Sequence, residues 1–431
     1  MLHTPPVSVF TAYYGAATRI RQTSEALMDI DRRTALARMS LLAAAAALPG
    51  LGATQEDPHA GQGSQPAERG TRLRKIATEE AFTIPEMVEP MREVLRRGGS
   101  SLDLTLLATI YGEASGAPPQ TQPTVQAPSG TGKASSNRDA LARLLLPKLL
   151  DLDAARLADM DANGVDMQLV SLSMPGVQIL EPGTAAALAR VANDRLSEAV
   201  RRYPTRFAGL ASFAPQDAHA AAKEMERAIN TLKLNGFIVN SHTDNTYLDD
   251  PRYWPILEAA EALDAPLYIH PRAPSDGMAV PFRDYRMEGA VWGYGIETST
   301  HIVRLMFSGV LDRFPRLRIV IGHMGEALPF WMWRLDFMGA PGARGAARKN
   351  ELKPSEYFRR NFAITTSGVE DPLALRFCID KLGIDHVMWA IDYPFQPTAP
   401  AVAFLESAQL SDEERAKVAH RNAERIFRIT A

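Results

Sequence analysis

One pattern recurs four times in the sequence: a run of apolar, mostly β-branched residues that ends in polar residues able to do chemistry. It is clearest in residues 318–326 (RIVIGHMGE), and it appears again in residues 75–82, 266–271 and 386–394. Such runs are typical of strands buried on both faces of a parallel sheet. In an α/β barrel, chemistry is assembled at the carboxyl ends of these strands. The pattern therefore predicts both a parallel sheet and the edge that carries its site.

Strands and helices alternate regularly between these runs. We count eight predicted strands, each followed by a helical segment, which favours an α/β fold of the (β/α)8 TIM-barrel kind over a doubly wound sheet. One predicted helix spans residues 144–161 and ends at Asn163-Gly164, a pair typical of a helix C-terminus.

The barrel is predicted over residues 73–431, with a polar insert near residues 112–137. A loop of that length inside a compact domain is usually a lid or a disordered segment. Because it follows the first strand, we expect it at the barrel mouth. Residues 54–72 are rich in Gly, Gln, Pro and charge, which predicts a linker.

Residues 1–53 have the composition of a targeting segment. Arg32 and Arg33 precede a short apolar run at residues 41–48, and small residues follow it. That order is typical of a signal peptide, and the paired arginines favour the twin-arginine route. The run is too short to span a bilayer. We therefore expect a periplasmic protein without a membrane span, with Met28 as a candidate true start; the alternative is a cytoplasmic protein that begins with an ordinary helix.

The charge balance and the cysteine content exclude several classes of function. A net charge of −3 with scattered Lys and Arg gives no indication of a nucleic-acid partner. Cys378 is the single cysteine, so an intramolecular disulfide and a cysteine-based zinc site are excluded. Its place on the apolar side of a predicted helix indicates a buried core thiol.

Three residues are candidate ligands for a divalent cation. Glu79, His270 and Asp392 are expected at the ends of the first, fifth and eighth strands. The first and eighth strands are neighbours in a closed barrel, so these side chains can converge at the mouth. Two carboxylates and an imidazole suit a divalent cation. Each residue alone is more often solvated or simply hydrogen-bonded, and their shared placement carries the prediction.

A second group of candidates surrounds His323. Glu326 follows three residues later and can hydrogen-bond the imidazole, which fixes its tautomer and raises its basicity. Arg334 lies on an aromatic predicted helix, where its guanidinium either binds a substrate carboxylate or pairs with Asp336. His242, after the fourth strand, is a substrate-binding candidate whose alternative is a supporting loop position.

These motifs resemble those of the metal-dependent aromatic acid decarboxylases of the amidohydrolase superfamily. The resemblance runs from about Leu73 to the C-terminus and implies an amidohydrolase-type barrel. It rests on residues 74–82, 158–161, 240–243, 268–271, 322–326 with Arg334, and 388–396.

The resemblance implies that Glu79, His270 and Asp392 are the metal ligands. Many superfamily members carry a histidine two positions after the first-strand acid, where this chain has Ala81, as several decarboxylases do. One imidazole fewer leaves an oxygen-rich site. The expected metal therefore shifts from Zn²⁺, which stays possible, toward Mn²⁺ or Mg²⁺, with Mn²⁺ favoured.

The resemblance also implies roles beside the metal. His323 and Glu326 match an acid/base pair, and Arg334 matches an arginine that binds the substrate carboxylate. A second arginine that binds the substrate is expected after the first strand. Arg138 and Arg143 are both candidates, because the polar insert prevents a residue-by-residue match with the family there.

The implied reaction is non-oxidative decarboxylation of a hydroxylated aromatic acid resembling 5-carboxyvanillate or a hydroxybenzoate. Asp392 is the favoured proton donor to the ring carbon, and the protein is expected to be a dimer or tetramer of identical chains. One alternative is a hydrolase, such as a lactonase or amidase, that uses the same ligands to activate water. The other is a periplasmic binding protein without a metal site, against which the intact ligand set argues.

Overall fold

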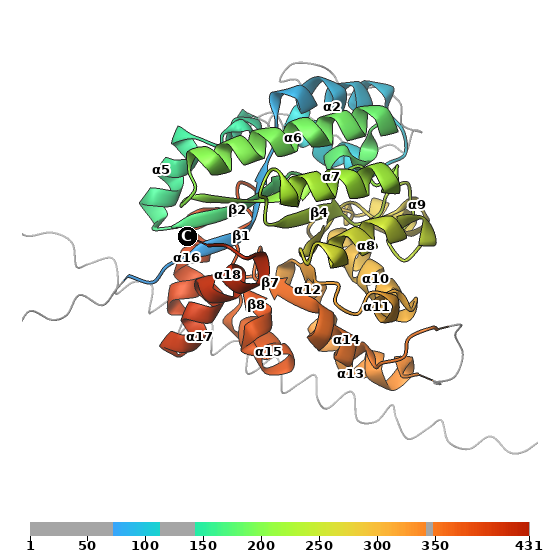
Figure 1. Cartoon of the computed structure of the whole chain (residues 1–431), viewed down its shortest axis with the longest axis vertical. Helices are drawn as coiled ribbons and strands as arrows, with labels where there is room; N and C mark the ends of the chain where they lie inside the picture. The colour runs from blue at the N-terminus through green and yellow to red at the C-terminus, as the bar shows by residue number, and fades with distance from the viewer. Residues whose placement is uncertain (1–71, 113–142, 342–347, 431) are drawn as a thin grey trace, which may run out of the picture. The chain divides into compact units, whose positions relative to one another are not determined.

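Eight parallel strands form one sheet in which neighbours follow the order of the sequence, from β1 to β8 (Figure 1). Helices alternate with the strands and pack outside them, so the predicted (β/α)8 barrel is confirmed. The strands are β1 Ile76–Phe82, β2 Met167–Leu172, β3 Phe207–Ser212, β4 Gly236–Asn240, β5 Leu267–His270, β6 Ile319–Ile321, β7 Phe362–Thr365 and β8 Val387–Met388.

The structure, a computed structural model, describes residues 72–112, 143–341 and 348–430. The predicted targeting segment 1–53, the linker up to residue 71 and all of the polar insert after residue 112 lie outside this part of the chain. None of the helices within these ranges has the length and apolar character needed to cross a membrane.

The α-helices of the described ranges are α2 Pro85–Arg97, α3 Asp103–Tyr111, α5 Ala154–Asn163, α6 Pro182–Arg202, α7 Ala218–Asn230, α8 Trp254–Ala262, α9 Asp276–Arg283, α10 Gly293–Phe307, α11 Val310–Arg313, α12 His323–Glu326, α13 Leu328–Gly339, α14 Pro354–Asn361, α15 Pro372–Leu382, α16 Thr398–Ser407, α17 Asp412–Ala416 and α18 Asn422–Phe427, together with helical residues 143–150. Single turns lie at Gly176–Ile179, Pro251–Tyr253 and Ile384–His386, and a π-helical turn at Lys417–Arg421 joins α17 to α18.

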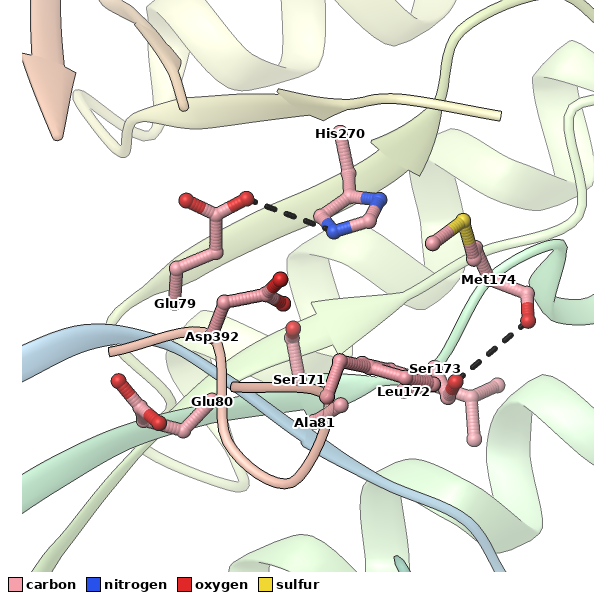
Figure 2. Close-up of a pocket in the computed structure, with 10 residues that line it drawn as sticks. Glu79, Glu80, Ala81, Ser171, Leu172, Ser173, Met174, His270 and Asp392 are labelled. Carbon is pink, nitrogen blue, oxygen red and sulfur yellow. Dashed lines mark hydrogen bonds and ion pairs between the residues drawn. The ribbon is translucent and has the colours of Figure 1, made fainter. Parts of the chain in front are cut away.

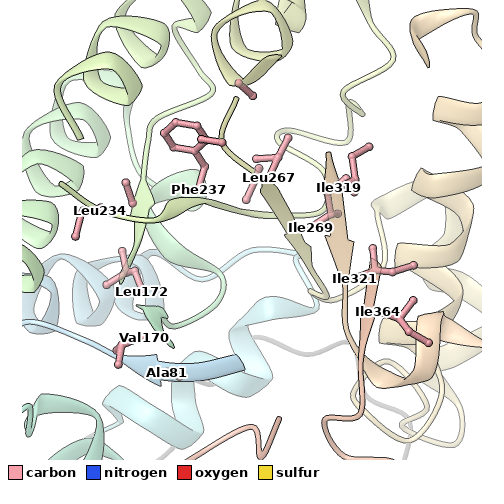
Figure 3. Close-up of a cluster of buried hydrophobic side chains, with 14 of the residues drawn as sticks. Ala81, Val170, Leu172, Leu234, Phe237, Leu267, Ile269, Ile319, Ile321 and Ile364 are labelled. Carbon is pink, nitrogen blue, oxygen red and sulfur yellow. The ribbon is translucent and has the colours of Figure 1, made fainter. Parts of the chain in front are cut away.

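Side chains alternate along each strand, and this alternation gives the barrel two apolar cores. The outward-facing residues pack against the helices and form the larger core (Figure 3). Burying a large aliphatic or aromatic side chain contributes about 1.5–3 kcal/mol, so these cores supply most of the stability. The second core comprises Ile76, Met167, Leu169, Ala208, Leu210, Ile238, Tyr268, Val320, Ala363 and Met388 from the strands, and Ala423, Ile426, Phe427 and Ile429 from the C-terminal segment.

Strand β1 contains a β-bulge that decides where its first acid points. Ala77 pairs with Gln168, whereas Glu80 pairs with Val170, so β1 has one residue more than β2 between these pairs. An extra residue reverses the alternation beyond it. Glu79 therefore turns toward the barrel interior from the middle of β1, and the expectation that it lies at the end of the first strand was wrong.

The helix predicted over residues 144–161 is two helices. Residues 143–150 are helical, and α5 begins again at Ala154. The Asp151 carboxylate accepts hydrogen bonds from the backbone N–H groups of Asp153 (2.8 Å) and Arg156 (2.7 Å). An aspartate that satisfies free N–H groups in this way starts a new helix. The predicted C-terminal stop is confirmed, because Gly164 takes a left-handed conformation with φ 65°.

β1 and β8 meet at the seam that closes the barrel. β8 has only two residues, so the segment beyond it makes much of the contact. The Thr78 hydroxyl donates to the carbonyl oxygen of Trp389 (2.8 Å), and the Ala81 N–H donates to that of Tyr393 (2.7 Å). These bonds fasten residues 389–393 to β1 and bring Asp392 to the barrel mouth.

On α15, Cys378 is buried as predicted, and burial raises the pKa of its thiol to about 12.

Candidate active site

Glu79 is buried inside the barrel, where three hydroxyl groups hold one of its two oxygens. Tyr268 donates to Oε2 at 2.5 Å, Thr365 donates to it at 2.8 Å, and Ser367 donates to it as well. Gly322 completes this cradle, because a Cβ atom there would lie 2.7 Å from both carboxylate oxygens. The sequence therefore places a glycine directly before His323 so that β6 can approach the carboxylate.

The second oxygen of Glu79 faces His270. Oε1 is buried and makes no hydrogen bond, and it lies 3.4 Å from His270 Nε2 (Figure 2). The other ring nitrogen, Nδ1, donates to the carbonyl oxygen of Pro271 at 2.7 Å, which leaves Nε2 with its lone pair. Burial lowers the pKa of His270, so the ring is neutral. An unpaired carboxylate oxygen and an imidazole lone pair thus face each other at one point.

Asp392 lies on the segment after β8 and points into the same pocket (Figure 2). Burial, and then the negative charge of Glu79, hold the pKa of its carboxyl well above the usual range. For Glu79, burial also opposes ionisation, but the positive charge of His323 and the hydroxyl hydrogen bonds outweigh it and lower the pKa. The two acids of the pocket therefore have pKa values that are shifted in opposite directions.

The pocket is lined by residues from several strand ends and the segments after them. They are Glu79, Glu80, Ala81, Ser171, Leu172, Ser173, Met174, His270, Asp392 and Phe395. Ala81, two positions after Glu79 in β1, is among them.

Within the described ranges, no group of three His, Cys, Asp or Glu side chains already has a metal-holding arrangement. The donor set nevertheless fits a divalent cation. Glu79 Oε1 lacks a partner, His270 Nε2 has a free lone pair, and Asp392 supplies a second carboxyl. Buried polar atoms are rarely left without partners in proteins, so an unpaired carboxylate oxygen indicates a ligand position.

His323 begins a left-handed turn directly after β6. His323, Met324, Gly325, Glu326 and Ala327 all have positive φ values, between 50° and 74°. Non-glycine residues rarely adopt this conformation, and such strain is concentrated at functional sites. The turn brings His323 Nδ1 to 2.9 Å from Glu326 Oε1, so the predicted pairing of these two residues is confirmed.

The imidazole of His323 is surrounded by negative charge. Desolvation lowers its pKa, but the charges of Glu326, Glu79 and Asp392 outweigh that effect and raise the pKa to about 10. His323 is therefore protonated at neutral pH in this structure. Its ring lies edge-on to that of His270, with the centroids 6.5 Å apart.

Two of the predicted substrate-binding residues, His242 and Arg334, are not among those that line the pocket. Both ring nitrogens of His242 are bound to backbone groups: Nε2 lies 3.1 Å from the Ala273 carbonyl oxygen, and Nδ1 accepts from Asn245 N–H at 3.3 Å. Burial lowers the pKa of His242 to about 4, which keeps the ring neutral. This geometry is that of a supporting residue, and the substrate-binding role of His242 stays a prediction. Arg138 lies outside the described residues, and Arg143 is exposed.

Arg334 is exposed on α13. The alternative partner, Asp336, accepts a hydrogen bond from Ser355 N–H at 2.8 Å instead. No ion pair joins Arg334 to Asp336 within the described part of the chain. The alternative of a pair with another acid stays open, and the role of Arg334 toward substrate stays a prediction.

Sequence reasoning missed the hydroxyl cradle of Glu79. Tyr268 precedes His270 by two positions, so it points to the same side of β5, and this spacing could have indicated it. Thr365 ends β7 and Ser367 follows it two residues later, at a strand to which no chemistry was assigned. Glu80 was also missed, since an acid next to a candidate ligand in a strand is expected to face away from it.

The comparisons with known proteins agree with this geometry. An amidohydrolase family model matches residues 147–429. A gamma-resorcylate decarboxylase from Polaromonas sp. is 36% identical over 293 residues, which cover 66% of this chain and 90% of that protein. Another, from Rhodococcus jostii, is 36% identical over 296 residues, with 66% and 90% coverage.

Solved structures give the same result. The 5-carboxyvanillate decarboxylase from Sphingomonas paucimobilis matches with a TM-score of 0.73 and 51% identity, covering 83% of this chain and all (100%) of that one. The enzyme of that name from Novosphingobium aromaticivorans, complexed with manganese and 4-hydroxy-3-methoxy-5-nitrobenzoic acid, matches with a TM-score of 0.73 and 36% identity, covering 83% and 96%. The barrel, the family model and these relatives together show that the chain belongs to the amidohydrolase family.

Proposed function

We propose that this chain is a metal-dependent decarboxylase of a hydroxylated aromatic acid, with 5-carboxyvanillate as the first substrate to test. The observation that carries the proposal is the convergence of Glu79, His270 and Asp392 on one pocket beside a protonated His323. The 51% identity to a 5-carboxyvanillate decarboxylase supports this substrate over simpler hydroxybenzoates.

The proposed cofactor is one divalent cation per chain, with Mn²⁺ favoured over Mg²⁺ and Zn²⁺. Glu79, His270 and Asp392 would hold it. Two carboxyl oxygens and one imidazole form a harder donor set than the histidine-rich sites that zinc prefers. Solved relatives with bound manganese support the same choice. When bound, the cation supplies a Lewis acid that orients the substrate carboxylate and hydroxyl oxygens.

The chain's own residues would carry the proton transfer. Asp392 is the proposed proton donor, since burial and the negative charge of Glu79 hold the pKa of its carboxyl well above the usual range, and its proton would move to the ring carbon that bears the carboxylate. The carbon–carbon bond to that carboxylate then breaks, its electron pair returns to the ring, and CO₂ leaves. His323, held by Glu326, balances the negative charge of the substrate while the ring is not aromatic.

The first prediction tests the reaction itself. Protein reconstituted with Mn²⁺ should release CO₂ from 5-carboxyvanillate or 2,6-dihydroxybenzoate, and chelation should abolish the release. Benzoate should not react, because it has no ring hydroxyl to supply electrons. His270→Ala should lose both the stoichiometric metal, measured by elemental analysis, and the activity.

Ring opening of a lactone without CO₂ release would favour the hydrolase alternative. Full metal content and rate in His270→Ala would contradict the proposed ligand set.

The second prediction separates proton chemistry from substrate binding. His323→Asn should lower kcat by roughly 10²–10³-fold, the usual cost of removing a group that stabilises the charge developing in the transition state. Arg334→Ala should instead reduce kcat/KM, at a cost of roughly 1.5–3 kcal/mol for a lost charged hydrogen bond. Steady-state kinetics and thermal melts on both variants measure the difference.

Arg334→Lys is the matched control, since it keeps the charge and loses the forked geometry, and its kinetics should be intermediate. An increase in KM with unchanged kcat in His323→Asn would show that its role is binding. Unchanged kinetics in Arg334→Ala would remove this arginine from the site.

A homo-oligomer is a further part of the proposal. On α13, Phe330, Trp331, Trp333 and Phe337 are 71%, 55%, 67% and 64% exposed. Monomers rarely expose so many large aromatic side chains on one helix, and aromatic residues are enriched at interfaces. We expect this face to bind a second copy of the chain, in a dimer or tetramer.

Trp333→Glu tests the oligomer. Trp333 stacks on Phe337 with the ring centroids 5.2 Å apart, on an exposed surface, so the substitution should leave the barrel folded. Light scattering should show a smaller particle for the variant than for the wild type. A monomeric wild type, or a variant of unchanged size, would refute the assignment of this face.

Export by the twin-arginine route is the proposed localisation. The support is the Arg32-Arg33 pair before the apolar residues 41–48. Residues 28–53 should be absent from the mature protein, as measured by intact-mass analysis of protein from its native host. Protein that retains these residues in the cytoplasmic fraction would support the cytoplasmic alternative.

A further inference from the structure

We propose that Glu80 is a positioning residue for Asp392, and that it acts by holding the two backbone N–H groups on either side of Asp392. The inference deepens the proposed function, because Asp392 is there both a metal ligand and the proton donor. Glu80 itself would touch neither the metal nor the substrate.

The geometry is that of a two-point clamp. Glu80 is fully buried, with 0% of its surface exposed. One carboxylate oxygen accepts from Ile391 N–H at 3.1 Å, and the other accepts from Tyr393 N–H at 2.9 Å. Both oxygens are therefore used on the residues that immediately precede and follow Asp392. A carboxylate is suited to this task, since it offers two acceptors in one plane and no donor.

The segment that is clamped needs such support. Asp392 has φ 74°, in the left-handed region that residues with a Cβ atom rarely occupy. This conformation persists only where the surroundings impose it. Its carbonyl oxygen accepts from Gln396 N–H at 3.0 Å, so Asp392 is also tied to the segment that follows. Without the clamp, the backbone at Asp392 can relax toward an ordinary conformation and turn its carboxyl away from Glu79.

A buried arginine supports the same arrangement. Arg156 is fully buried, and its Nη2 donates to the Ala81 carbonyl oxygen at 2.6 Å, next to Glu80 in β1. Its guanidinium lies over the Tyr393 ring, 4.7 Å from the centroid. The positive charge of Arg156 thus contacts the residue after Glu80 and the residue after Asp392. Burial raises the pKa of Glu80 to about 7, and the hydrogen bonds from Tyr393 and Ile391 and the charge of Arg156 act against that rise.

A simple fastening role for Glu80 predicts a different outcome from a positioning role. Thr78 provides the comparison, because its hydroxyl also joins β1 to the segment after β8, at Trp389, three residues before Asp392. Thr78→Val removes one bond across the same seam and leaves the amides around Asp392 untouched. If Glu80 only fastens the seam, Glu80→Gln and Thr78→Val should both lower the melting temperature, and both variants should bind Mn²⁺ with the affinity of the wild type.

The experiment measures Mn²⁺ affinity by electron paramagnetic resonance titration of full-length wild type, Glu80→Gln and Thr78→Val. A glutamine side chain has the same size but one acceptor oxygen, so it cannot accept from both amides. Loss of a residue that orients a metal ligand typically weakens metal binding by roughly 10–100-fold. We expect that loss in Glu80→Gln, a comparable fall in kcat with little change in KM, and wild-type Mn²⁺ affinity in Thr78→Val.

Two further measurements keep the inference testable if Glu80→Gln folds poorly. Glu80→Asp is one methylene shorter, so its Mn²⁺ affinity should lie between those of wild type and Glu80→Gln. Hydrogen exchange at the Ile391 and Tyr393 amides should be faster in the Glu80 variants than in Thr78→Val. Wild-type Mn²⁺ affinity in either Glu80 variant, or equal weakening in Thr78→Val, would overturn the inference.

The readouts separate this inference from the proposed function. Mn²⁺ affinity and amide exchange are measured without any substrate. If the wild type binds Mn²⁺ and no aromatic acid is decarboxylated, the proposed reaction fails while the clamp is still supported or refuted by the variants.

Discussion

The site depends on keeping one ionised carboxylate, Glu79, inside a barrel whose core is otherwise apolar. An isolated buried charge is strongly unfavourable, so it must be paired or hydrogen-bonded. Three hydroxyl groups satisfy Oε2, and the absence of a side chain at Gly322 makes the room. Oε1 receives no such bond and is directed at His270. The same interactions that make the charge tolerable therefore determine which oxygen is available to a ligand.

The charges around the pocket depend on one another. The positive charge of His323 lowers the pKa of Glu79, and the negative charge of Glu79 raises the pKa of Asp392. The pKa of His323 is raised to about 10 by the same carboxylates together with Glu326. A cation held by Glu79 and Asp392 would favour the ionised form of both acids and would lower the pKa of the imidazole. Metal binding and proton transfer are thus coupled through the same three side chains.

The sequence was informative about the barrel and about most of the charged residues of the site. Buried parallel strands are recognisable as apolar runs, and the run over β5 ends, as predicted, in His270. The failures have local physical causes. Periodicity cannot reveal the bulge in β1, because the extra residue at Glu79 changes the register only with respect to β2. It cannot reveal the break at Asp151 either, since the apolar spacing continues through it.

Periodicity also does not show which side chains hydrogen-bond to one another. A threonine or serine at a strand end is common, and only the assembled barrel shows that Thr365 and Ser367 share one oxygen of Glu79. Periodicity does not predict the exposure of Arg334 either. That exposure depends on how α13 is oriented and not on the aromatic composition of this helix.

The two proposed acid/base residues of the site, His323 and Asp392, both have left-handed backbones, and a glutamate contacts each of them or its neighbours. Glu326 binds the ring of His323 from within the same turn, whereas Glu80 binds the amides around Asp392 from a different strand. The first arrangement is local and moves with its turn. The second fixes Asp392 relative to β1, the strand that carries Glu79. Two carboxyl groups that must approach a common point repel each other when ionised, so their separation has to be set by the backbone. Glu80 is adjacent to Glu79 in β1 and binds the amides on either side of Asp392. It therefore sets the separation of the two acids directly.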